Sequence, residues 1–372
     1  MKVLLYNTRP DSLQDWGGDT TQLQQTQRAM EALGVQVVYG REHPPDLAGY
    51  DLVHLFNLQL AQNGVELATR AKEKGLPVAL STIWWDLSYI DRSPESHPFR
   101  RYGPVSRLLM RISPTAAFSY RQLRRQLNKS GRRRRRAQRR LLEMADVVLP
   151  NSHAELEILV QQFQMPNLRA KAFVVPNGVT VLPQDGCTLR DHWPQLPHRY
   201  VLEAARCHHL KGQARVIRAL RDEKEIPIVL AGDDFETTKY GRWCKQLGQA
   251  RGNVFFLGAV PHERMPLLYR HAGVHVLPSL RESPGLASLE AAVHGANCVI
   301  SIHCPVEEYF GKDAFVCDPD DLGSVRRAIL QAWTHPPTAA LRSRILSSFT
   351  WTRAALRTYE AYQWIVQGVH AR

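Results

Sequence analysis

The chain has 372 residues, a net charge of +13 at pH 7, 44% hydrophobic residues and 22% charged residues. This length favours two domains, and the composition is that of an ordinary soluble globular protein. No apolar run approaches the ~20 residues that span a bilayer, and the first ten residues lack the apolar core of a signal peptide. Six cysteines without C-x-x-C spacing predict neither a zinc site nor a disulfide framework, so we expect a cytoplasmic protein.

Most of the positive charge lies in one basic segment. Residues 121–140, RQLRRQLNKSGRRRRRAQRR, carry eleven Arg or Lys and no acid, which leaves +2 for the remainder of the chain. Such a segment favours anionic lipid headgroups, nucleic-acid phosphates or a polyanionic glycan as partners. The alternative is a solvated loop without a partner.

The first half of the chain alternates short apolar runs with helical patterns. Expected strands cover residues 2–7, 35–39, 51–56, 77–81 and 146–150. Expected helices cover residues 20–33, 62–74 and 151–163. Between the fourth and fifth strands an arginine-rich stretch is expected to be helical in pieces, with breaks at Pro94, Pro98, Pro104 and Pro114. Apolar strands separated by helices predict a parallel sheet covered on both faces.

A loop containing Gly17 and Gly18 separates the first expected strand from its helix. Glycine has no Cβ, so such a loop can bring backbone N–H groups against a phosphate or a sugar ring. It does not match G-x-G-x-x-G, which argues against a dinucleotide site. The alternative is an ordinary tight turn.

Turn residues at 173–179 predict a crossover into a second domain with the same alternation. Expected strands there cover residues 200–205, 226–231, 254–257, 273–277 and 298–301, with a helix at 212–221. From residue 351 the pattern is that of an amphipathic helix. The economical architecture is α/β with two Rossmann-like domains and a ligand in the crevice at the carboxyl ends of their strands. The domain limits are then 1–175, 176–350 and a terminal helix at 351–372.

The stretch RESPGLASLEAAVHGANCVIS, residues 281–301, predicts a helix with defined ends. Ser283 is expected to cap it and Pro284 to occupy its first position, because proline has no N–H to lose there. Gly295 is expected to end the helix in the left-handed conformation.

Two acids flank the start of this helix. Glu282 precedes it, and Glu290 lies inside it, roughly 10 Å further along at ~1.5 Å per residue. The free N–H groups of the first turn, together with Gly285, predict an anion site, and the acids could hold hydroxyls of the same ligand. The alternative is any well-capped helix of an α/β protein.

Two cations follow the first strand of the second domain. Arg206 and Lys211 stand at the strand end and at the start of the next helix, where they would converge on one anion. The alternative is a pair of surface charges near a helix start.

In order, the Gly-Gly loop, R-x4-K-G, a G-D turn, L-G-x-V and P-S-x-x-E-S-P-G-L-x-x-L-E-A resemble the family 4 retaining glycosyltransferases of the GT-B fold. The resemblance covers nearly the whole chain and includes Trp351 in the terminal helix. The segments WGGDTTQL, DLVHLFN and ALSTIWWDLS look like bacterial members found with surface-polysaccharide genes. The fold implied is GT-B, with two Rossmann-like domains that face one another across a cleft.

The resemblance implies which residues bind a nucleotide-sugar donor. Arg206 and Lys211 would neutralise its diphosphate. Glu290 would bind the ribose hydroxyls, and Glu282 the sugar hydroxyls near the reacting carbon. Backbone amides would approach the phosphates from both domains, at Gly285, Leu286, Gly17 and Gly18.

The acceptor side is less well matched. The exit of the fourth strand often contains histidine in this family, whereas this chain has Trp84-Trp85-Asp86. His54 or Asp86 could contact the acceptor or the reacting sugar, and the alternative for each is a structural role.

The expected activity is a retaining hexosyl transfer from a UDP- or GDP-linked sugar to a hydroxyl of a glycan or lipid-linked acceptor, in cell-surface polysaccharide synthesis. We expect no metal or other cofactor, because fixed cations neutralise the leaving group and no Asp-x-Asp site is needed. Residues 121–140 would dock the enzyme on the inner face of the plasma membrane. The alternatives are a DNA-base glycosyltransferase and a non-catalytic sugar- or nucleic-acid-binding protein on the same fold.

Overall fold

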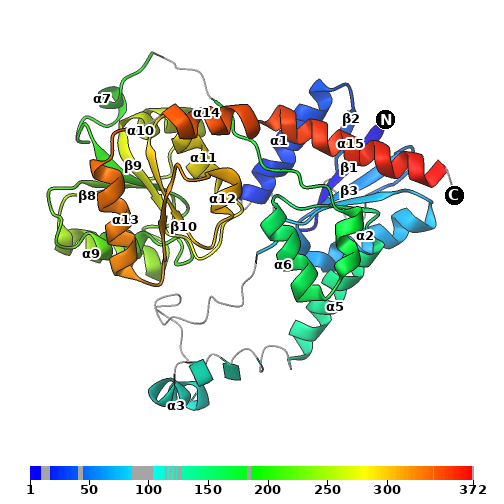
Figure 1. Cartoon of the computed structure of the whole chain (residues 1–372), viewed down its shortest axis with the longest axis horizontal. Helices are drawn as coiled ribbons and strands as arrows, with labels where there is room; N and C mark the ends of the chain where they lie inside the picture. Colours follow the sequence, from blue (N-terminus) through cyan, green and yellow to red (C-terminus); the bar gives the residue numbers. More distant parts are fainter. Residues whose placement is uncertain are drawn as a thin grey trace. The chain divides into compact units, whose positions relative to one another are not determined.

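A computed structural model describes most of the chain, namely residues 1–9, 17–40, 45–85, 104–113, 115–117, 119–120, 123, 128–181, 186–337 and 339–370. The chain forms two compact units, each built on its own parallel sheet (Figure 1). Unit 1 takes residues 1–86, 120–178 and 349–372, and unit 2 takes residues 87–119 and 179–348. None of the described helices combines the length and the apolar character needed to cross a bilayer.

The sheet of unit 1 has the strand order β2-β1-β3-β4-β5, with every pair parallel. Its strands are β1 (Lys2–Asn7), β2 (Gln36–Tyr39), β3 (Leu52–Phe56), β4 (Val78–Ser81) and β5 (Val147–Leu149). All five agree with the predicted strands to within one residue. The prediction succeeded because β3, β4 and β5 are buried along their whole length, and such strands read as continuous apolar runs.

Helices cover both faces of this sheet (Figure 1). They are α1 (Gly18–Ala32), α2 (Ala61–Glu73), α5 (Lys129–Met144), α6 (His153–Phe163) and α15 (Trp351–His370), with 3₁₀ turns η1 (Leu58–Leu60) and η3 (Pro166–Lys171). On one face Leu67, Leu141 and Leu159 bring α2, α5 and α6 into one apolar cluster. On the other face Leu23 and Tyr362 do the same for α1 and α15, so the last helix completes the core of unit 1.

The sheet of unit 2 has the strand order β11-β10-β9-β6-β7-β8, again all parallel. Its strands are β6 (Tyr200–Ala204), β7 (Ile228–Ala231), β8 (Val254–Gly258), β9 (Ala272–Leu277), β10 (Asn297–Ser301) and β11 (Phe315–Cys317). The first five were predicted. The sixth, β11, was missed, because it has three residues and lies at the sheet edge with Val316 exposed.

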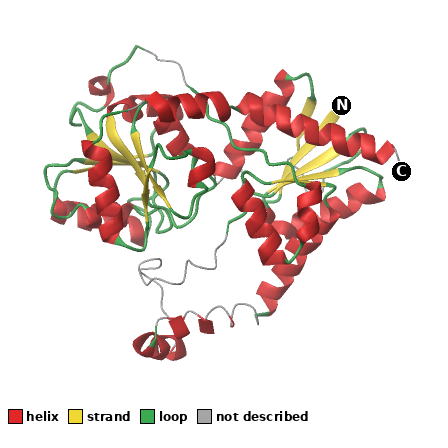
Figure 2. Cartoon of the chain, viewed as in Figure 1, coloured by secondary structure: helices red, strands yellow, loops and turns green. Residues whose placement is uncertain are grey.

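The helices of unit 2 also lie on both sides of its sheet (Figure 2). They are α7 (Leu189–His192), α8 (Gln213–Ala219), α9 (Lys239–Arg251), η4 (His262–Arg264), α10 (Met265–His271), α11 (Leu286–Val293), α12 (Val306–Tyr309), α13 (Leu322–Thr334) and α14 (Ala339–Ser348). Helix α3 (Pro104–Ile112) is also assigned to unit 2. Val216, Cys244 and Val325 join α8, α9 and α13 in one core cluster. Helices α10 and α11 pack against β9, and the loops that lead to them start at the carboxyl ends of β8 and β9.

Candidate active site

The ion pair between Lys211 and Glu282 is the central contact of unit 2. The Lys211 ammonium binds Oε1 of Glu282, with 33% of the lysine side chain and 11% of the glutamate side chain exposed. Lys211 precedes α8, and Glu282 lies in the loop after β9. The two predicted ligand-binding residues therefore meet across 71 positions of sequence.

Backbone contacts between these two loops place the pair. The amide N–H of Leu280 donates to the carbonyl of Leu210 at 2.8 Å, and Ser279 Oγ donates to the same carbonyl at 2.9 Å. Gly212, the N-cap of α8, has φ +108°, and a Cβ there would lie 2.7 Å from the carbonyl oxygen of Pro278. Glycine is therefore required where the two loops touch.

Arg206 lies half-buried in the loop that leaves β6, at the same end of the sheet as Lys211. Its carbonyl accepts a hydrogen bond from Nε2 of Gln213, the first residue of α8, at 3.2 Å. A Cβ on Gly232 would lie 2.0 Å from the carbonyl oxygen of Ala205, so the exits of β6 and β7 pack closely here. The loop that carries both predicted cations is thereby fixed.

Helix α11 begins later than predicted. Its first residue is Leu286 and its N-cap is Gly285, so the expected cap by Ser283 and the expected first position for Pro284 are both wrong. The reason is the backbone of Gly285, whose φ of +91° and ψ of 92° are not helical. The end of the helix was predicted correctly, because Gly295 has φ +92°.

This later start leaves the first turn of α11 without a side-chain cap. A Cβ on Gly285 would lie 3.5 Å from Cγ of Glu282 and 3.1 Å from Cδ2 of Leu277, so the glycine and the acid are neighbours. The amides of Gly285 and Leu286 therefore stand beside Glu282 at an uncapped helix start, where the helix dipole favours negative charge.

Glu290 projects from α11 into a small polar cluster. Its Oε1 accepts a hydrogen bond from His262 Nε2 at 3.0 Å, and its Oε2 accepts one from the Tyr269 hydroxyl at 2.9 Å. The hydrogen bond to Glu290 raises the pKa of His262, and burial together with Glu290 raises the pKa of Tyr269. A carboxylate has about four acceptor positions, so Glu290 can still accept from ligand hydroxyls. Neither partner could be predicted from a local sequence pattern, since both lie more than 20 residues away from Glu290.

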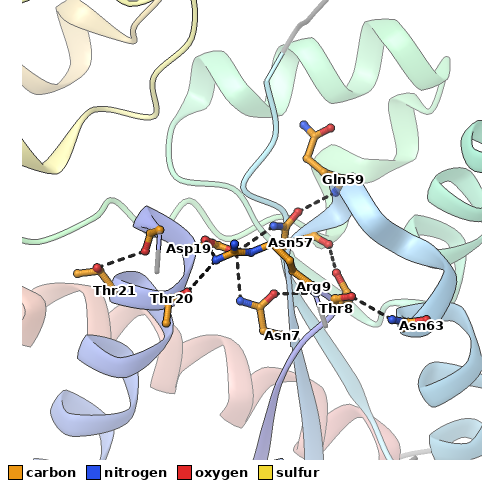
Figure 3. A network of polar contacts seen from close by, with 10 residues as sticks. Asn7, Thr8, Arg9, Asp19, Thr20, Thr21, Asn57, Gln59 and Asn63 are labelled. Atoms are coloured by element: carbon orange, nitrogen blue, oxygen red, sulfur yellow. Dashed lines mark hydrogen bonds and ion pairs between the residues drawn. The ribbon is translucent and has the colours of Figure 1, made fainter. Parts of the chain in front are cut away.

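Asp19 organises the corresponding strand ends of unit 1 (Figure 3). Its carboxylate accepts from Asn7 Nδ2 at 3.1 Å, from Asn57 Nδ2 at 3.1 Å, and from Arg9 Nε and Nη2 at 3.0 Å each. Arg9 Nη2 also donates to Thr20 Oγ1 at 3.0 Å. The carboxylate thus joins the exits of β1 and β3 to the first turn of α1, and the sequence analysis did not identify it.

Gly17 and Gly18 stand beside this network. Gly17 is the N-cap of α1, and a Cβ there would lie 2.8 Å from Oδ1 of Asp19 and 3.3 Å from Nη2 of Arg9. A side chain on Gly17 would therefore displace the ion pair, whereas Gly18 has open space where its Cβ would be. The loop is closely packed on one side and accessible on the other, as a backbone anion site requires.

His54 is a core residue in this structure. It is 1% exposed, with Nδ1 2.6 Å from the Tyr362 hydroxyl and Nε2 2.9 Å from Ser81 Oγ. Burial lowers its pKa to about 3, so the ring is neutral and links α15 to the sheet. The structure thus favours the structural alternative for His54 over contact with an acceptor. The other acceptor-side candidate, Asp86, lies outside the described residues.

Part of the basic segment forms α5, which Asn128 caps by accepting from the Ser130 amide. Two of its exposed arginines are tied to the C-terminus of α6: Arg135 donates to the Gln162 carbonyl, and Arg139 donates to the Phe163 carbonyl at 2.9 Å. Five exposed arginines have no partner within the described ranges: Arg132, Arg133, Arg134, Arg136 and Arg140. Of the four prolines expected to break this region, Pro104 alone is described, and it begins α3.

One group of residues in the described part of the chain could hold a metal ion. It consists of His303, Asp318 and Asp320, whose ligand atoms lie within 4.8 Å of one another. They lie in the loops after β10 and β11. Asp318 Oδ1 already accepts from the Asp320 amide at 2.9 Å, and the Asp318 amide donates to Ser324 Oγ at 3.0 Å. These contacts are those of a loop leading into α13.

Comparisons with known proteins relate part of the chain to a family of glycosyltransferases. Residues 192–345 match the family described as glycosyl transferases group 1. The chain is 29% identical over 163 residues to an O-antigen chain mannosyltransferase B of Escherichia coli, covering 41% of each chain. It is 32% identical over 209 residues to a glycogen synthase of Mycobacterium tuberculosis, covering 52% of this chain and 48% of that one.

The whole chain also resembles a solved structure, the sucrose-phosphate synthase of Thermosynechococcus elongatus. The TM-score is 0.76 at 17% identity, and the match covers 99% of this chain and 100% of that one. The chain spans less than half the length of the two curated relatives above. The predicted GT-B fold of two Rossmann-like domains is confirmed. The predicted resemblance to family 4 glycosyltransferases is confirmed as a resemblance to glycosyl transferases group 1.

Proposed function

Starting from this chain's resemblance to group 1 glycosyltransferases on the GT-B fold, we propose that it transfers a hexosyl group from a nucleoside-diphosphate sugar to a hydroxyl acceptor, with retention at the anomeric carbon. The observation that carries the proposal is the cluster at the strand ends of unit 2. There Lys211 contacts Glu282, Arg206 shares the loop that leads to Lys211, and the uncapped start of α11 stands beside Glu282.

Each part of such a donor has a matching group in unit 2. The diphosphate is anionic and suits Arg206, Lys211 and the first-turn amides of α11. The sugar and the ribose carry hydroxyls, which suit the carboxylates of Glu282 and Glu290. In the reaction the bond between the anomeric carbon and the phosphate oxygen breaks, and negative charge develops on the diphosphate. Cations fixed in place stabilise this charge more in the transition state than in the bound donor.

The proposed step is attack by the acceptor hydroxyl on the face that the diphosphate leaves. A bond forms between the hydroxyl oxygen and the anomeric carbon, and the proton passes to the departing phosphate oxygen. This accounts for retention without a covalent enzyme intermediate. Because protein cations stabilise the leaving group, we propose that turnover needs no divalent metal, which assays in excess chelator test directly.

The first experiment identifies a donor. Thermal shift with UDP-glucose, UDP-galactose, UDP-N-acetylglucosamine and GDP-mannose should show one that stabilises the protein, by about 2.7 kcal/mol at one hundred times its Kd. GDP-mannose is included because one relative is named a mannosyltransferase. With that donor, Arg206→Ala and Lys211→Ala should each lower kcat by about 10²–10³-fold. Lys224→Ala, an exposed lysine of unit 2, serves as the control. Near-normal kcat in both variants would refute the proposal.

We further propose that the acceptor is lipid-linked and that α5 docks the enzyme on an anionic membrane surface. The five exposed arginines of α5 that have no partner among the described residues support this, because each basic residue near an anionic surface contributes about 1 kcal/mol. Vesicles with 30% phosphatidylglycerol should bind the protein at low salt, and neutral phosphatidylcholine vesicles should not. A variant with all five arginines replaced by glutamine should lose this binding and keep its activity on a soluble acceptor. If duplex DNA rather than the vesicles raises donor turnover, the result would favour a DNA-base glycosyltransferase.

A further inference from the structure

Lys211 and Glu282 have separate tasks in the proposed reaction, yet in the structure they bind one another. Lys211 is assigned to the diphosphate and Glu282 to the sugar. Their contact occupies both groups at once, and in the described residues neither side chain has another ion-pair or hydrogen-bond partner. A diphosphate that draws the Lys211 ammonium toward itself therefore weakens the contact with Glu282.

Apart from the first-turn amides of α11, the surroundings offer Glu282 little compensation when that happens. Its side chain is 11% exposed, so water reaches only a small part of it. Neither the Cys304 thiol nor the Glu203 carboxyl supplies a positive charge to Glu282. Burial raises the pKa of both groups, and the charge of Glu282 contributes to both shifts. Leaving a nearly buried carboxylate without a donor is costly, and more so than the pair itself is favourable.

We infer that Glu282 acts as a specificity-determining residue by competing for Lys211, so that a nucleoside diphosphate binds tightly only while it carries its sugar. The inference rests on the proposed function. A bare nucleoside diphosphate attracts Lys211 and leaves Glu282 unpaired. A nucleotide sugar attracts Lys211 in the same way, but its hydroxyls donate to Glu282 and replace the lost contact.

The same competition favours product release. Once the sugar has moved to the acceptor, the remaining diphosphate no longer supplies donors to Glu282. Lys211 then returns to Glu282, and the backbone contacts that hold Leu280 and Ser279 to Leu210 keep the two side chains within reach. Glu282 thereby limits inhibition of the enzyme by its own product.

The test compares wild type with Glu282→Gln, which keeps the size of the side chain and removes its charge. Affinities for UDP, GDP and the matching nucleotide sugars are measured by calorimetry. The variant should bind the bare diphosphate about tenfold more tightly, and the nucleotide sugar no more tightly than wild type does. Product inhibition should strengthen by the same factor. An unchanged or weaker affinity for the bare diphosphate would overturn the inference.

Two further variants control this test. Glu223→Gln removes the same charge from the Arg326–Glu223 pair, which lies ahead of β7 at the other end of the sheet, and should leave both affinities unchanged. In a Lys211→Met background, Glu282→Gln should no longer tighten diphosphate binding. If Glu282→Gln alone is unstable, Glu282→Asp serves instead, because its shorter side chain weakens the contact with Lys211 and should tighten binding of the bare diphosphate in the same direction. A wild type that binds none of these nucleotides would instead refute the proposed function.

Discussion

Replacing Asp19 with alanine should destabilise unit 1 by about 3 kcal/mol. The substitution removes the acceptor of four hydrogen bonds and takes the Asp19 carboxylate away from the Arg9 guanidinium, with only 16% of the Arg9 side chain exposed. Breaking a buried ion pair from one side costs about 3–5 kcal/mol, and the remaining exposure of Arg9 places the estimate at the lower end. The amide groups of Asn7 and Asn57 lose their acceptor as well.

Calorimetry and urea unfolding measure this loss. A domain of this size loses about 2–4 °C of Tm for each kcal/mol, so the transition of unit 1 should fall by about 6–12 °C. Asp19→Asn keeps one acceptor oxygen and should lie between alanine and wild type. Asp51→Ala is the matched control, because Asp51 in the same unit accepts from the Lys2 amide with half of its side chain exposed, and it should cost under about 1 kcal/mol. If Asp19→Ala and Asp51→Ala lower the free energy of unfolding equally, the hydrogen bonds of Asp19 do not stabilise unit 1 as proposed.

Hydrogen bonds of His54, Tyr269 and His262 lead to three other predictions. The pKa of His54 is lowered to about 3, so its contribution to stability falls as pH drops below 6.5. In urea unfolding, wild type should therefore lose about 2 kcal/mol more than His54→Gln between pH 7 and 5. Equal losses in the two proteins would refute this prediction. Tyr269→Phe removes a donor to Glu290 and should raise the Kd for UDP or GDP about three- to tenfold, while Tyr200→Phe, whose hydroxyl donates to a backbone carbonyl, should not. The raised pKa of His262 adds stability that is fully present below pH 6.5 and is lost as pH rises through the folded pKa of His262. His262→Gln should therefore lower the free energy of unfolding more at pH 5.5 than at pH 8.5. The difference should be less than about 1 kcal/mol, because the His262 side chain is half-exposed. Equal costs at both pH values would show that the contact with Glu290 is not charge-assisted.

The strands were predictable because burial on both faces leaves a continuous apolar run in the sequence. β11 escaped prediction because a three-residue edge strand carries too little of that signal. The start of α11 was mispredicted because Ser-Pro is a typical helix opening, whereas the φ of Gly285, a tertiary feature, fixed the actual boundary.

The candidate site was predictable only where it lies in one short stretch of sequence. The spacing of Arg206 and Lys211 follows from one strand and one turn, and it could be read directly. The contact of Lys211 with Glu282 depends on two loops that meet in space, and no local pattern encodes it. The hydrogen bonds to Asp19 could not be predicted from a local pattern either, since their donors lie 10 to 38 positions away in the sequence.

The position of α15 has a consequence for the order in which the protein can fold during synthesis. Unit 2 has all its residues once the ribosome has passed residue 348, but unit 1 receives the core side chains of α15 only afterwards. The face of the first sheet that α1 covers therefore lacks the side chains of α15 while the whole of unit 2 is translated. Tyr362, which closes that side by bonding to His54, is among the last core residues to leave the exit tunnel, so the half that is begun first is completed last.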